Sequence, residues 1–413
     1  MSTIQVPFFR PDIREQDIEE VVTTLRSGWL TTGSKVRQFE LDFAAAVGAR
    51  HAVAVNSCTA ALHLAVEALG LKPGEAVLVP TMTFAATAEV VRYQGAIPIL
   101  VDCDPTTNMD LADALRKIEK LRSGSLTDTL PKETRVAGIM PVHVGGFMMN
   151  VPEVQKFAAE HNLWIVEDAA HAFPAASRSS LDTTWRRCGE GTADVTCFSF
   201  YANKTITTGE GGMAVTGDKQ LAERIKLMSL HGLSHDAWGR YSGNGNWDYK
   251  IVAPGYKYNL TDIAASIGIH QLARAEEMRQ AREAIASRYV EGFRDMEEIT
   301  LPANCSNRLH AWHLFPIRLQ FSVGAATRTS FLKKLKSRGI GFSVHWRPLH
   351  LHPYYQQTFG WKASDCPVAT NVWQMSVSLP IFSGMLSGEQ NYVIETVREL
   401  CSSAAYQAVR KTA

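Results

Sequence analysis

Short apolar runs recur through the first part of the chain, separated by stretches with a helical pattern. They lie at residues 51–55, 76–80, 97–102, 136–142, 163–168, 195–200 and 212–217. Most are rich in β-branched residues and lack alternation, which is typical of strands buried on both faces. Helical patterns such as CTAALHLAVEALG and PEVQKFAAEH separate many of them. Alternating strands and helices favour a mostly parallel sheet that is covered on both sides.

The chain departs from this alternation near both ends. Before the first strand, apolar positions recur at helical spacing and predict a helix, at Ile18, Val21, Val22 and Leu25. From Asn259 the sequence LTDIAASIGIHQLARAEEMRQAREAIASRYVEGF predicts one long helix or two joined helices. Beyond Pro302 strand and helix signals mix again, as in HAWHLFPIRL and RTSFLKKLKSRG.

We therefore expect an α/β protein with two domains. A large α/β domain with a mostly parallel mixed sheet takes residues 1–255, and its alternating pattern runs over roughly 15–250. A linking helix takes residues 256–300, and a smaller C-terminal α+β domain takes 301–413. The polar segment 174–192 predicts a loop or a short hairpin.

Composition narrows the function classes. Hydrophobic residues make up 46% of the chain and charged residues 20%, as in ordinary soluble globular proteins. The 42 Lys and Arg nearly balance the 41 Asp and Glu, so no global field attracts nucleic acid or an anionic membrane. No signal core or membrane-span pattern occurs, and the seven cysteines are scattered without a CxxC pair. We expect a cytoplasmic protein with reduced thiols, no metal site, and no nucleic-acid or membrane partner.

A lone lysine stands out among the candidate chemical groups. Lys204 follows the apolar run VTCFSF and precedes the glycines of GEGGMAVTG. If it is buried beside cationic or apolar groups, its pKa falls and the amine becomes nucleophilic. Ser199, five residues earlier, could help to hold a phosphate. The alternative is a loop lysine that caps carbonyls, although glycines at 209, 211 and 212 indicate a close-packed neighbour.

A second candidate is the segment IVEDAAHA at residues 165–172. Asp168 follows a buried strand, and strand ends in α/β sheets point into the ligand crevice. A carboxylate there needs a partner, because burying it unpaired is costly. The alternatives are a helix cap or a metal ligand for Asp168, and a core histidine for His171.

Two turns rich in small or polar residues could each bind an anion. The turn NSCTAAL at residues 56–62 joins a strand to a helix, where backbone N–H groups at the helix end suit a phosphate. An ordinary N-cap by Ser57 or Thr59 is the alternative.

The other turn, GYKYNLTD at residues 255–262, precedes the long helix. Lys257 and Asn259 could reach an anion there. The alternative is a plain helix entry capped by Thr261 or Asp262.

Together these groups meet the needs of pyridoxal 5'-phosphate (PLP). A lysine forms the Schiff base, a phosphate site anchors the cofactor, and a carboxylate keeps the pyridine nitrogen protonated so that the ring is an electron sink. The charges of Asp168 and a pyridinium would each lower the cost of burying the other. Phe84, after the strand AVLVP, is a candidate to stack on the ring.

These stretches, in this order, resemble the DegT/DnrJ/EryC1/StrS family of sugar aminotransferases. The resemblance runs from PFFRPDI and SGWLTTGSKVRQFE, through the LHPYY region, to SVSLPIF, so it covers nearly the whole chain. Within the family, GYKYNLTDIAASIG, EDAAHA, HAWHLF and VHWRPLHLHPYY look closest to the UDP-4-amino-4-deoxy-L-arabinose–oxoglutarate aminotransferase type. The resemblance implies the type I PLP-dependent aminotransferase fold, with the active site at a homodimer interface.

The resemblance also implies roles for individual residues. Lys204 would form the Schiff base and serve as general acid and base. Asp168 would pair with the pyridinium nitrogen, and His171, where many members have Gln, would lie near the phenolic oxygen. Phe84 would stack on the ring.

Other residues would hold the phosphate. The resemblance assigns this to the backbone amides of Thr59 and Ala60 with Ser199. Lys257 corresponds to a family Asn that reaches the phosphate across the dimer interface, and a cation there suits a phosphate. The neighbouring residues Cys58, where the family often has Gly, and Asn203 complete the expected cofactor-binding set.

The reaction implied is amino transfer from glutamate to a nucleotide-linked 4-keto sugar, giving 2-oxoglutarate. A 3-keto-sugar or cyclitol aminotransferase of the same family, or a non-catalytic regulatory protein with this fold, is the alternative. A sugar dehydratase of this fold would have histidine in place of Lys204, and a nicotinamide enzyme would show GxGxxG after an early strand.

Sequence reasoning leaves open the nucleotide, the sugar, the stereochemistry and the role of loop 174–192. Six further residues could touch a diphosphate or a sugar, or could equally be structural: His231, His313, Arg318, His345, Arg347 and His350.

Overall fold

The computed structural model describes residues 4–127, 130, 133–179, 183–233, 250–320 and 325–402. Within these residues the largest sheet has seven strands, in the order β1-β9-β8-β5-β4-β2-β3. The strands are β1 (His51–Val55), β2 (Ala76–Pro80), β3 (Ile97–Val101), β4 (Val136–Ile139), β5 (Trp164–Asp168), β8 (Val195–Ser199) and β9 (Gly212–Thr216).

The sheet is mixed but mostly parallel, as the apolar runs predict. Strand β2 pairs in parallel with β3 and β4, and parallel pairing continues from β4 to β5 and from β5 to β8. Only β9 runs against its neighbours β8 and β1. The carboxyl ends of the parallel strands therefore meet at one edge, where ligands bind in such sheets.

Both faces of the sheet are covered. On β8, Val195 and Cys197 belong to one core, whereas Phe198 and the following Phe200 belong to another. The helix α3 packs on the first face beside α4 and α7, and α2 packs on the second through Phe39 and Phe43, whose rings contact Phe200. These helices and those that flank the remaining strands are α2 (Ser34–Val47), α3 (Cys58–Ala68), α4 (Ala86–Tyr93), α5 (Leu111–Ser123), α6 (Val151–His161) and α7 (Lys219–Ser229).

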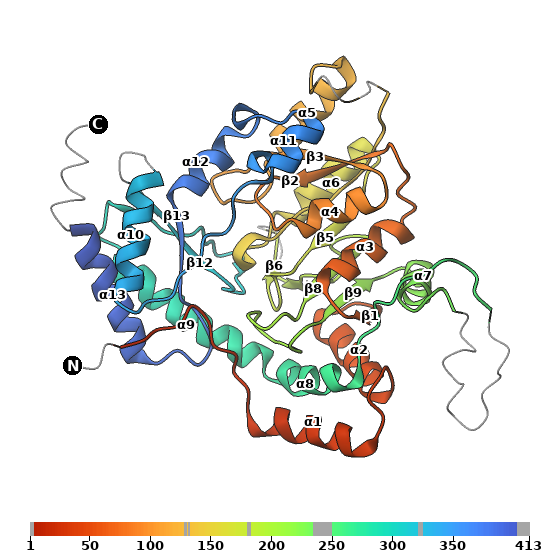
Figure 1. The fold of residues 1–413 in the computed structure, drawn as a ribbon, viewed down its shortest axis with the longest axis horizontal. Helices are drawn as coiled ribbons and strands as arrows, with labels where there is room; N and C mark the ends of the chain where they lie inside the picture. The colour runs from red at the N-terminus through yellow and green to blue at the C-terminus, as the bar shows by residue number, and fades with distance from the viewer. Residues whose placement is uncertain are drawn as a thin grey trace.

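Two joined helices, α8 (Asp262–Ala273) and α9 (Ala275–Phe293), lead away from this sheet (Figure 1). The sequence predicted one long helix or two joined ones, and Arg274 marks the junction. Thr261 caps α8, as expected, by accepting a hydrogen bond from the backbone N–H of Ala264.

The carboxyl-terminal part forms a second core around α9. Its three-stranded antiparallel sheet has the order β10-β12-β13, and Val6 from the amino-terminal segment also packs into this core. The boundaries of the domains stay a prediction. Besides α9, the second core takes β10 (Ile299–Thr300), β12 (Phe315–Leu319), α10 (Ala325–Ser337), β13 (Ser376–Leu379) and α13 (Ser387–Ser402). The helix α11 (Pro353–Phe359) and the 3-10 turn η3 (Leu349–Leu351) pack against the core of the large sheet instead. The remaining elements are α12 (Pro367–Met375) and the 3-10 turns η1 (Val144–Gly146), which follows β4, and η4 (Ala363–Asp365).

The segment 174–192 contains the short hairpin that its composition allowed. Strand β6 (Ala176–Ser177) pairs antiparallel with β7 (Arg186–Arg187), and on its other side with β11 (Arg308–Leu309). Residues 180–182 lie outside the described part of the chain.

The helix α1 (Glu15–Ser27) has an inverted pattern of burial. It lies along α8 (Figure 1), and the side chain of Asp17 faces inward, where its Oδ2 accepts hydrogen bonds from Arg274 and Gln271. The apolar positions face outward instead: Ile18 is 47% exposed and Leu25 is 50% exposed. The helix thus holds its own chain with polar contacts and presents an apolar stripe on the outside.

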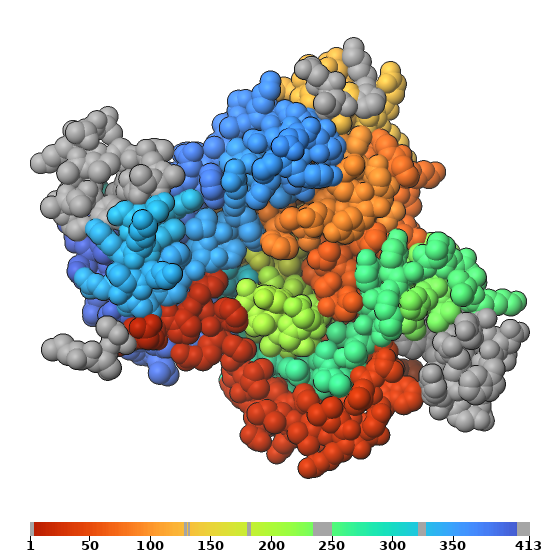
Figure 2. All heavy atoms as spheres, viewed as in Figure 1, coloured from red at the N-terminus to blue at the C-terminus, as the bar shows by residue number. Residues whose placement is uncertain are grey.

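The chain near residues 200–210 reaches the surface at the centre of one face. In Figure 2 its yellow-green atoms are surrounded by orange, red, green and blue segments from distant parts of the sequence. Among the described residues, the helices are all too short or too polar to cross a bilayer.

Candidate functional site

A cavity of about 400 Å³ lies at the carboxyl ends of the parallel strands. It brings together most of the residues singled out from the sequence: Cys58, Thr59, Phe84, Asp168, His171, Ser199, Asn203 and Lys204. Ala60 and Lys257 are the two predicted site residues that do not line it.

Asp168 ends β5, where pairing with β8 turns its side chain to the same face as Cys197. The carboxylate is buried and accepts hydrogen bonds from the Thr87 hydroxyl (2.7 Å) and the backbone N–H of Ala170 (3.1 Å). Burial raises the pKa of Asp168, and these two hydrogen bonds oppose the rise. A buried carboxylate in this setting is suited to pair with a cationic ring nitrogen.

Lys204 lies in the turn after β8, where its backbone N–H donates to the carbonyl of Tyr201. Burial of the amine lowers its pKa to about 8, although Cys58 and Asp168 oppose the shift. A substantial fraction of the amine is therefore unprotonated near neutral pH. This satisfies the condition under which the sequence predicted a nucleophilic lysine.

The turn before α3 is built from a cap and a close backbone approach. The Ser57 hydroxyl accepts a hydrogen bond from the Ala60 N–H (3.1 Å), so Ser57 is the N-cap, one of the two caps considered from the sequence. A Cβ on Gly212 would lie 2.4 Å from the Ser57 carbonyl carbon, so only glycine lets β9 pass this turn. In the glycine run after Lys204, Gly212 thus allows β9 to pack against the turn before α3, which lines the same cavity as the lysine.

His171 follows Asp168 and has a defined tautomer. Its Nδ1 accepts the backbone N–H of Gly145 (3.2 Å), so the proton of the neutral ring sits on Nε2. Burial, with the nearby Lys204 charge, holds the pKa of His171 well below its ordinary value. The ring therefore remains neutral and offers one N–H donor.

Three further groups that sequence reasoning left open or missed line the same cavity. His313 packs against His171 with ring centroids 4.2 Å apart, and the indole of Trp346 stacks on His171 at 5.1 Å. Burial holds the pKa of His313 well below its ordinary value and lowers that of His345 to about 4. Part of the cavity wall is thus a set of neutral imidazoles and an indole.

Of the other residues left open, none lines this cavity. His350 is buried and lies between the hydroxyls of Thr81 and Thr370, which marks it as structural. Arg318 donates to the carbonyl of Pro105, and Arg347 lines a neighbouring hollow.

Phe84 and Lys257 are exposed in the single chain. Phe84 is 63% exposed at the mouth of the cavity, where a bound ring would cover it. The Lys257 amine donates to the side-chain oxygen of Asn259 (2.5 Å), and Lys257 does not line the cavity of its own chain.

These residues fit PLP. The cavity joins an amine of lowered pKa, a buried carboxylate and a strand-to-helix turn whose backbone only a glycine neighbour can approach. The side-chain oxygen of Asn203 is buried and has no partner among the described residues, so a ligand group can satisfy it. When bound, PLP supplies the electron sink for amine chemistry.

Comparisons with known proteins point the same way. The DegT/DnrJ/EryC1/StrS aminotransferase family matches residues 11–398. The chain is 42% identical to the spore coat polysaccharide biosynthesis protein SpsC of Bacillus subtilis (strain 168), over 97% of this chain and 98% of that protein.

Two solved structures are similar over nearly their whole length. The putative sugar aminotransferase Spr1654 from Streptococcus pneumoniae, solved in PLP and PMP forms, is 30% identical in the PLP form, with a TM-score of 0.84 over 96% of this chain and 98% of that one. DesV of S. venezuelae, solved in complex with a ketimine intermediate, is 29% identical, with a TM-score of 0.84 over 97% of this chain and 100% of that one.

Proposed function

Because the chain belongs to the DegT/DnrJ/EryC1/StrS aminotransferase family and is a PLP-dependent sugar aminotransferase, we propose that it transfers an amino group from glutamate to a nucleotide-linked 4-keto sugar. The products are the amino sugar and 2-oxoglutarate. Within the family we propose the type that makes UDP-4-amino-4-deoxy-L-arabinose, on the sequence motifs that resemble it.

The observation that carries the proposal is the amine of Lys204 in a cavity with the Asp168 carboxylate. Lys204 would hold the cofactor, and its amine would also serve as the group that carries a proton during the transfer, for which a pKa of about 8 suits operation near neutral pH. Asp168 would keep the ring nitrogen protonated. The Nε2–H of His171 would donate a hydrogen bond to the phenolic oxygen, and Phe84 would cover one face of the ring.

The neutral wall of the cavity favours a sugar as acceptor. His171, His313 and His345 are all uncharged at neutral pH, and His313 and His345 each keep a ring nitrogen that can donate to or accept from a sugar hydroxyl. The indole of Trp346 offers an apolar face for a pyranose ring.

The cavity of one chain supplies too little positive charge for its ligands. Among the described residues that line it, Lys204 is the only lysine or arginine, yet the cofactor phosphate and the carboxylates of glutamate are anions. A homodimer resolves this, because Lys257 is exposed and would reach the phosphate bound in the partner subunit. The amide of Thr59, with Cys58, Ser199 and Asn203, would hold that phosphate from their own side, whereas the Ala60 amide that the sequence assigned to the phosphate donates to the Ser57 hydroxyl instead.

The wider setting follows from the same reasoning. We place the enzyme in the cytoplasm, where nucleotide sugars are made. The similarity to a spore coat polysaccharide protein supports an amino sugar made for a polysaccharide, such as a lipopolysaccharide, rather than for a secondary metabolite.

The test is the absorbance of the PLP-bound protein with and without glutamate. A band near 410–430 nm should give way to one near 330 nm, as the electron-sink chemistry requires. Nucleotide-linked 4-keto sugars, a 3-keto sugar and a cyclitol ketone are then compared by how fast the long-wavelength band returns. Fastest return with a 3-keto sugar or cyclitol would overturn the 4-keto assignment, and no band at all would favour a non-catalytic protein.

A further inference from the structure

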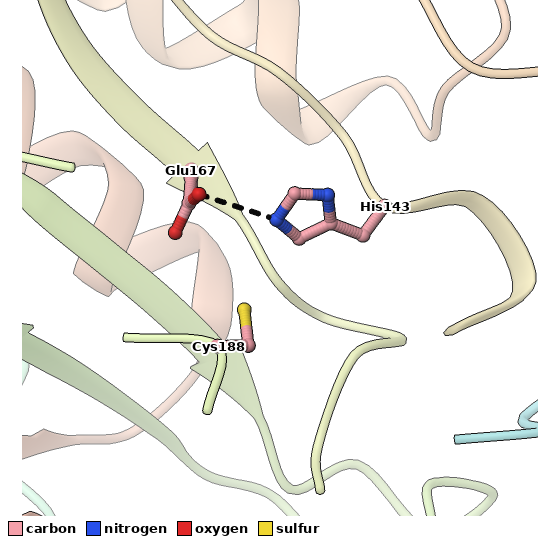
Figure 3. Close-up of side chains that lie close together, drawn as sticks. All are labelled: His143, Glu167 and Cys188. Atoms are coloured by element: carbon pink, nitrogen blue, oxygen red, sulfur yellow. Dashed lines mark ion pairs between the residues drawn. The ribbon is translucent and has the colours of Figure 1, made fainter. Parts of the chain in front are cut away.

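A buried polar cluster lies beside Asp168, on the strand β5 and the segments next to it (Figure 3). It consists of His143, from the turn after β4, Glu167 from β5, and Cys188 from the loop after β7. All three side chains are buried, with exposed fractions of 1%, 2% and 1%. Glu167 precedes Asp168 on the strand, so the two carboxylates point to opposite faces of the sheet.

The hydrogen bonds of His143 fix where its proton lies. Nδ1 accepts the backbone N–H of Met149 (3.2 Å), so in the neutral ring the proton is on Nε2. Nε2 faces Oε1 of Glu167 at 3.4 Å (dashed line in Figure 3). A metal ion at this cluster would need the Nε2 lone pair and would force a proton onto Nδ1, against the Met149 N–H. The protonated Nε2 therefore faces the Glu167 carboxylate at ion-pair distance without forming a well-aligned hydrogen bond, and this arrangement does not suit a metal ligand set.

Glu167 is held as an anion. Its Oε2 accepts hydrogen bonds from the hydroxyls of Thr192 (2.5 Å) and Thr196 (2.7 Å). Burial alone would raise the pKa of Glu167, but the contact with His143 and the two hydroxyls bring it below its ordinary value. Burial and the Glu167 charge raise the pKa of the Cys188 thiol, which stays protonated.

The turn that carries His143 touches both cofactor-facing residues of the next segment. The backbone N–H of His143 donates to the Asp168 carbonyl (3.3 Å), and the N–H of Gly145 donates to Nδ1 of His171. The carbonyls of Gly145 and Gly146 accept the N–H groups of Leu314 and Ala311, on either side of His313. One short turn thus fixes Asp168, His171 and His313.

We propose that Glu167 and His143 form a positioning pair for the cofactor site. Glu167 holds the Nε2–H tautomer of His143, which leaves Nδ1 to anchor Met149 and so locks the turn from Val142 to Phe147. The locked turn presents the Gly145 N–H to His171 and thereby directs the His171 proton at the cofactor. The inference rests on PLP binding in the cavity and is independent of which sugar is the substrate.

The experiment compares the PLP-bound wild-type enzyme with Glu167→Gln, His143→Phe and His143→Asn. The last keeps an acceptor near the Nδ1 position and loses the contact with Glu167. Two quantities are measured: the PLP dissociation constant, and the pH midpoint at which the cofactor absorbance changes. We expect about tenfold weaker PLP binding in His143→Phe. We also expect the pH midpoint of the cofactor absorbance to shift in Glu167→Gln and His143→Phe, in the same direction as in His171→Phe. The midpoint of His143→Asn should lie between that of the wild type and that of His143→Phe.

Two controls separate positioning from stability alone. Tyr289→Phe removes a buried hydroxyl from the carboxyl-terminal core, where it donates to the Pro380 carbonyl, and should lower the melting temperature without moving the midpoint. Thr196→Val keeps the shape of the side chain and removes one hydrogen-bond donor to Glu167, so it should shift the pH midpoint by less and in the same direction. This variant tests the proposal even if the other variants do not fold. The proposal is overturned if the midpoint stays at the wild-type value in all folded variants. It is also overturned if the purified enzyme carries stoichiometric zinc that His143→Phe loses.

Discussion

The hydroxyl of Thr87 donates a hydrogen bond to the carboxylate of Asp168 at 2.7 Å, and this bond determines which hydroxyl is the donor between Thr87 and Thr83. Because the only hydroxyl proton of Thr87 is used in this bond, the contact with Thr83 (2.7 Å) must be donated by Thr83. Two threonines on the entry to α4 therefore direct their protons toward the anion. The chain stabilises the charged form of Asp168 against the effect of its burial.

Replacing Thr87 tests this relationship. In Thr87→Val the carboxylate loses one donor, so its pKa rises further and its interaction with the ring nitrogen weakens. We expect about tenfold weaker PLP binding, equivalent to about 1.4 kcal/mol, measured by cofactor titration of the apoenzyme. Thr87→Ser keeps the hydroxyl and should bind within about threefold of wild type. Equal affinity in all three proteins would mean that the hydroxyl does not support Asp168.

The lowered pKa of Lys204 predicts a pH dependence for cofactor loading. Only the unprotonated amine attacks the cofactor aldehyde, and its fraction rises as the pH passes about 8. The rate at which apoenzyme and PLP develop the long-wavelength band should therefore rise up to about pH 8 and level off above it. An ordinary lysine would instead give a rate that still climbs at pH 10. Lys204→Ala should develop no band and lose activity by several orders of magnitude.

Gly212 and Gly217 flank the strand β9 and provide a matched pair. A Cβ on Gly212 meets the Ser57 and Cys58 backbone at 2.4–2.6 Å, whereas a Cβ on Gly217 meets nothing within 4 Å. Gly212→Ala should displace the turn before α3, lower the melting temperature and weaken PLP binding at least tenfold. Gly217→Ala should leave both quantities near wild type. Thermal melts and PLP titrations of the two variants measure these effects. A Gly212→Ala enzyme with the wild-type melting temperature and PLP affinity would contradict the packing argument.

Lys257 should contribute to PLP binding although it does not line the cavity of its own chain. If it reaches the phosphate in a partner subunit, Lys257→Ala removes a charge-assisted contact and weakens PLP binding about tenfold, with a smaller loss at high salt. Lys72→Ala, another exposed lysine, is the control and should bind PLP as wild type does. Unchanged affinity in Lys257→Ala at low salt would remove this residue from the cofactor site.

If the chain forms the proposed homodimer, the outward stripe on α1 should stabilise it. Serine at both Ile18 and Leu25 should lower the mass seen by light scattering from twice 45.6 kDa toward the single-chain value. The control is Leu386→Ser, a leucine that is 66% exposed elsewhere. If the double variant keeps the wild-type mass at micromolar concentration, this face of α1 lies outside the interface.

The strands of the sheet and the site residues Asp168 and Lys204 could be predicted from the sequence because the patterns that reveal them are local. A buried parallel strand needs a run of apolar residues, and the residue that ends it faces the crevice, so Asp168 and Lys204 stood out where they break such runs. Helix caps at Ser57 and Thr261 follow equally local rules. Each of these inferences needs fewer than about ten neighbouring residues.

The rest of the site depends on contacts between distant segments. His313 and His345 have the same sequence signature as the structural His350, and only the fold brings the first two beside His171. Thr87 carries no signal of its own, because threonine on a short helix is ordinary. The apolar face of α1 shows a further limit: periodicity reveals an apolar stripe but not which surface covers it.

The pairing of Val6 bears on how the chain is made. Its backbone N–H donates to the carbonyl of Gly339, and its carbonyl accepts the N–H of Gly341, so the amino-terminal segment around Val6 docks onto a segment more than 330 residues later in the sequence. During synthesis the amino-terminal arm emerges first but has no place to bind until that late segment has left the ribosome. The large sheet can close before then, whereas the second core must wait for nearly the whole polypeptide. A truncated chain released after the sheet would therefore keep a folded cofactor scaffold and a loose arm at its start.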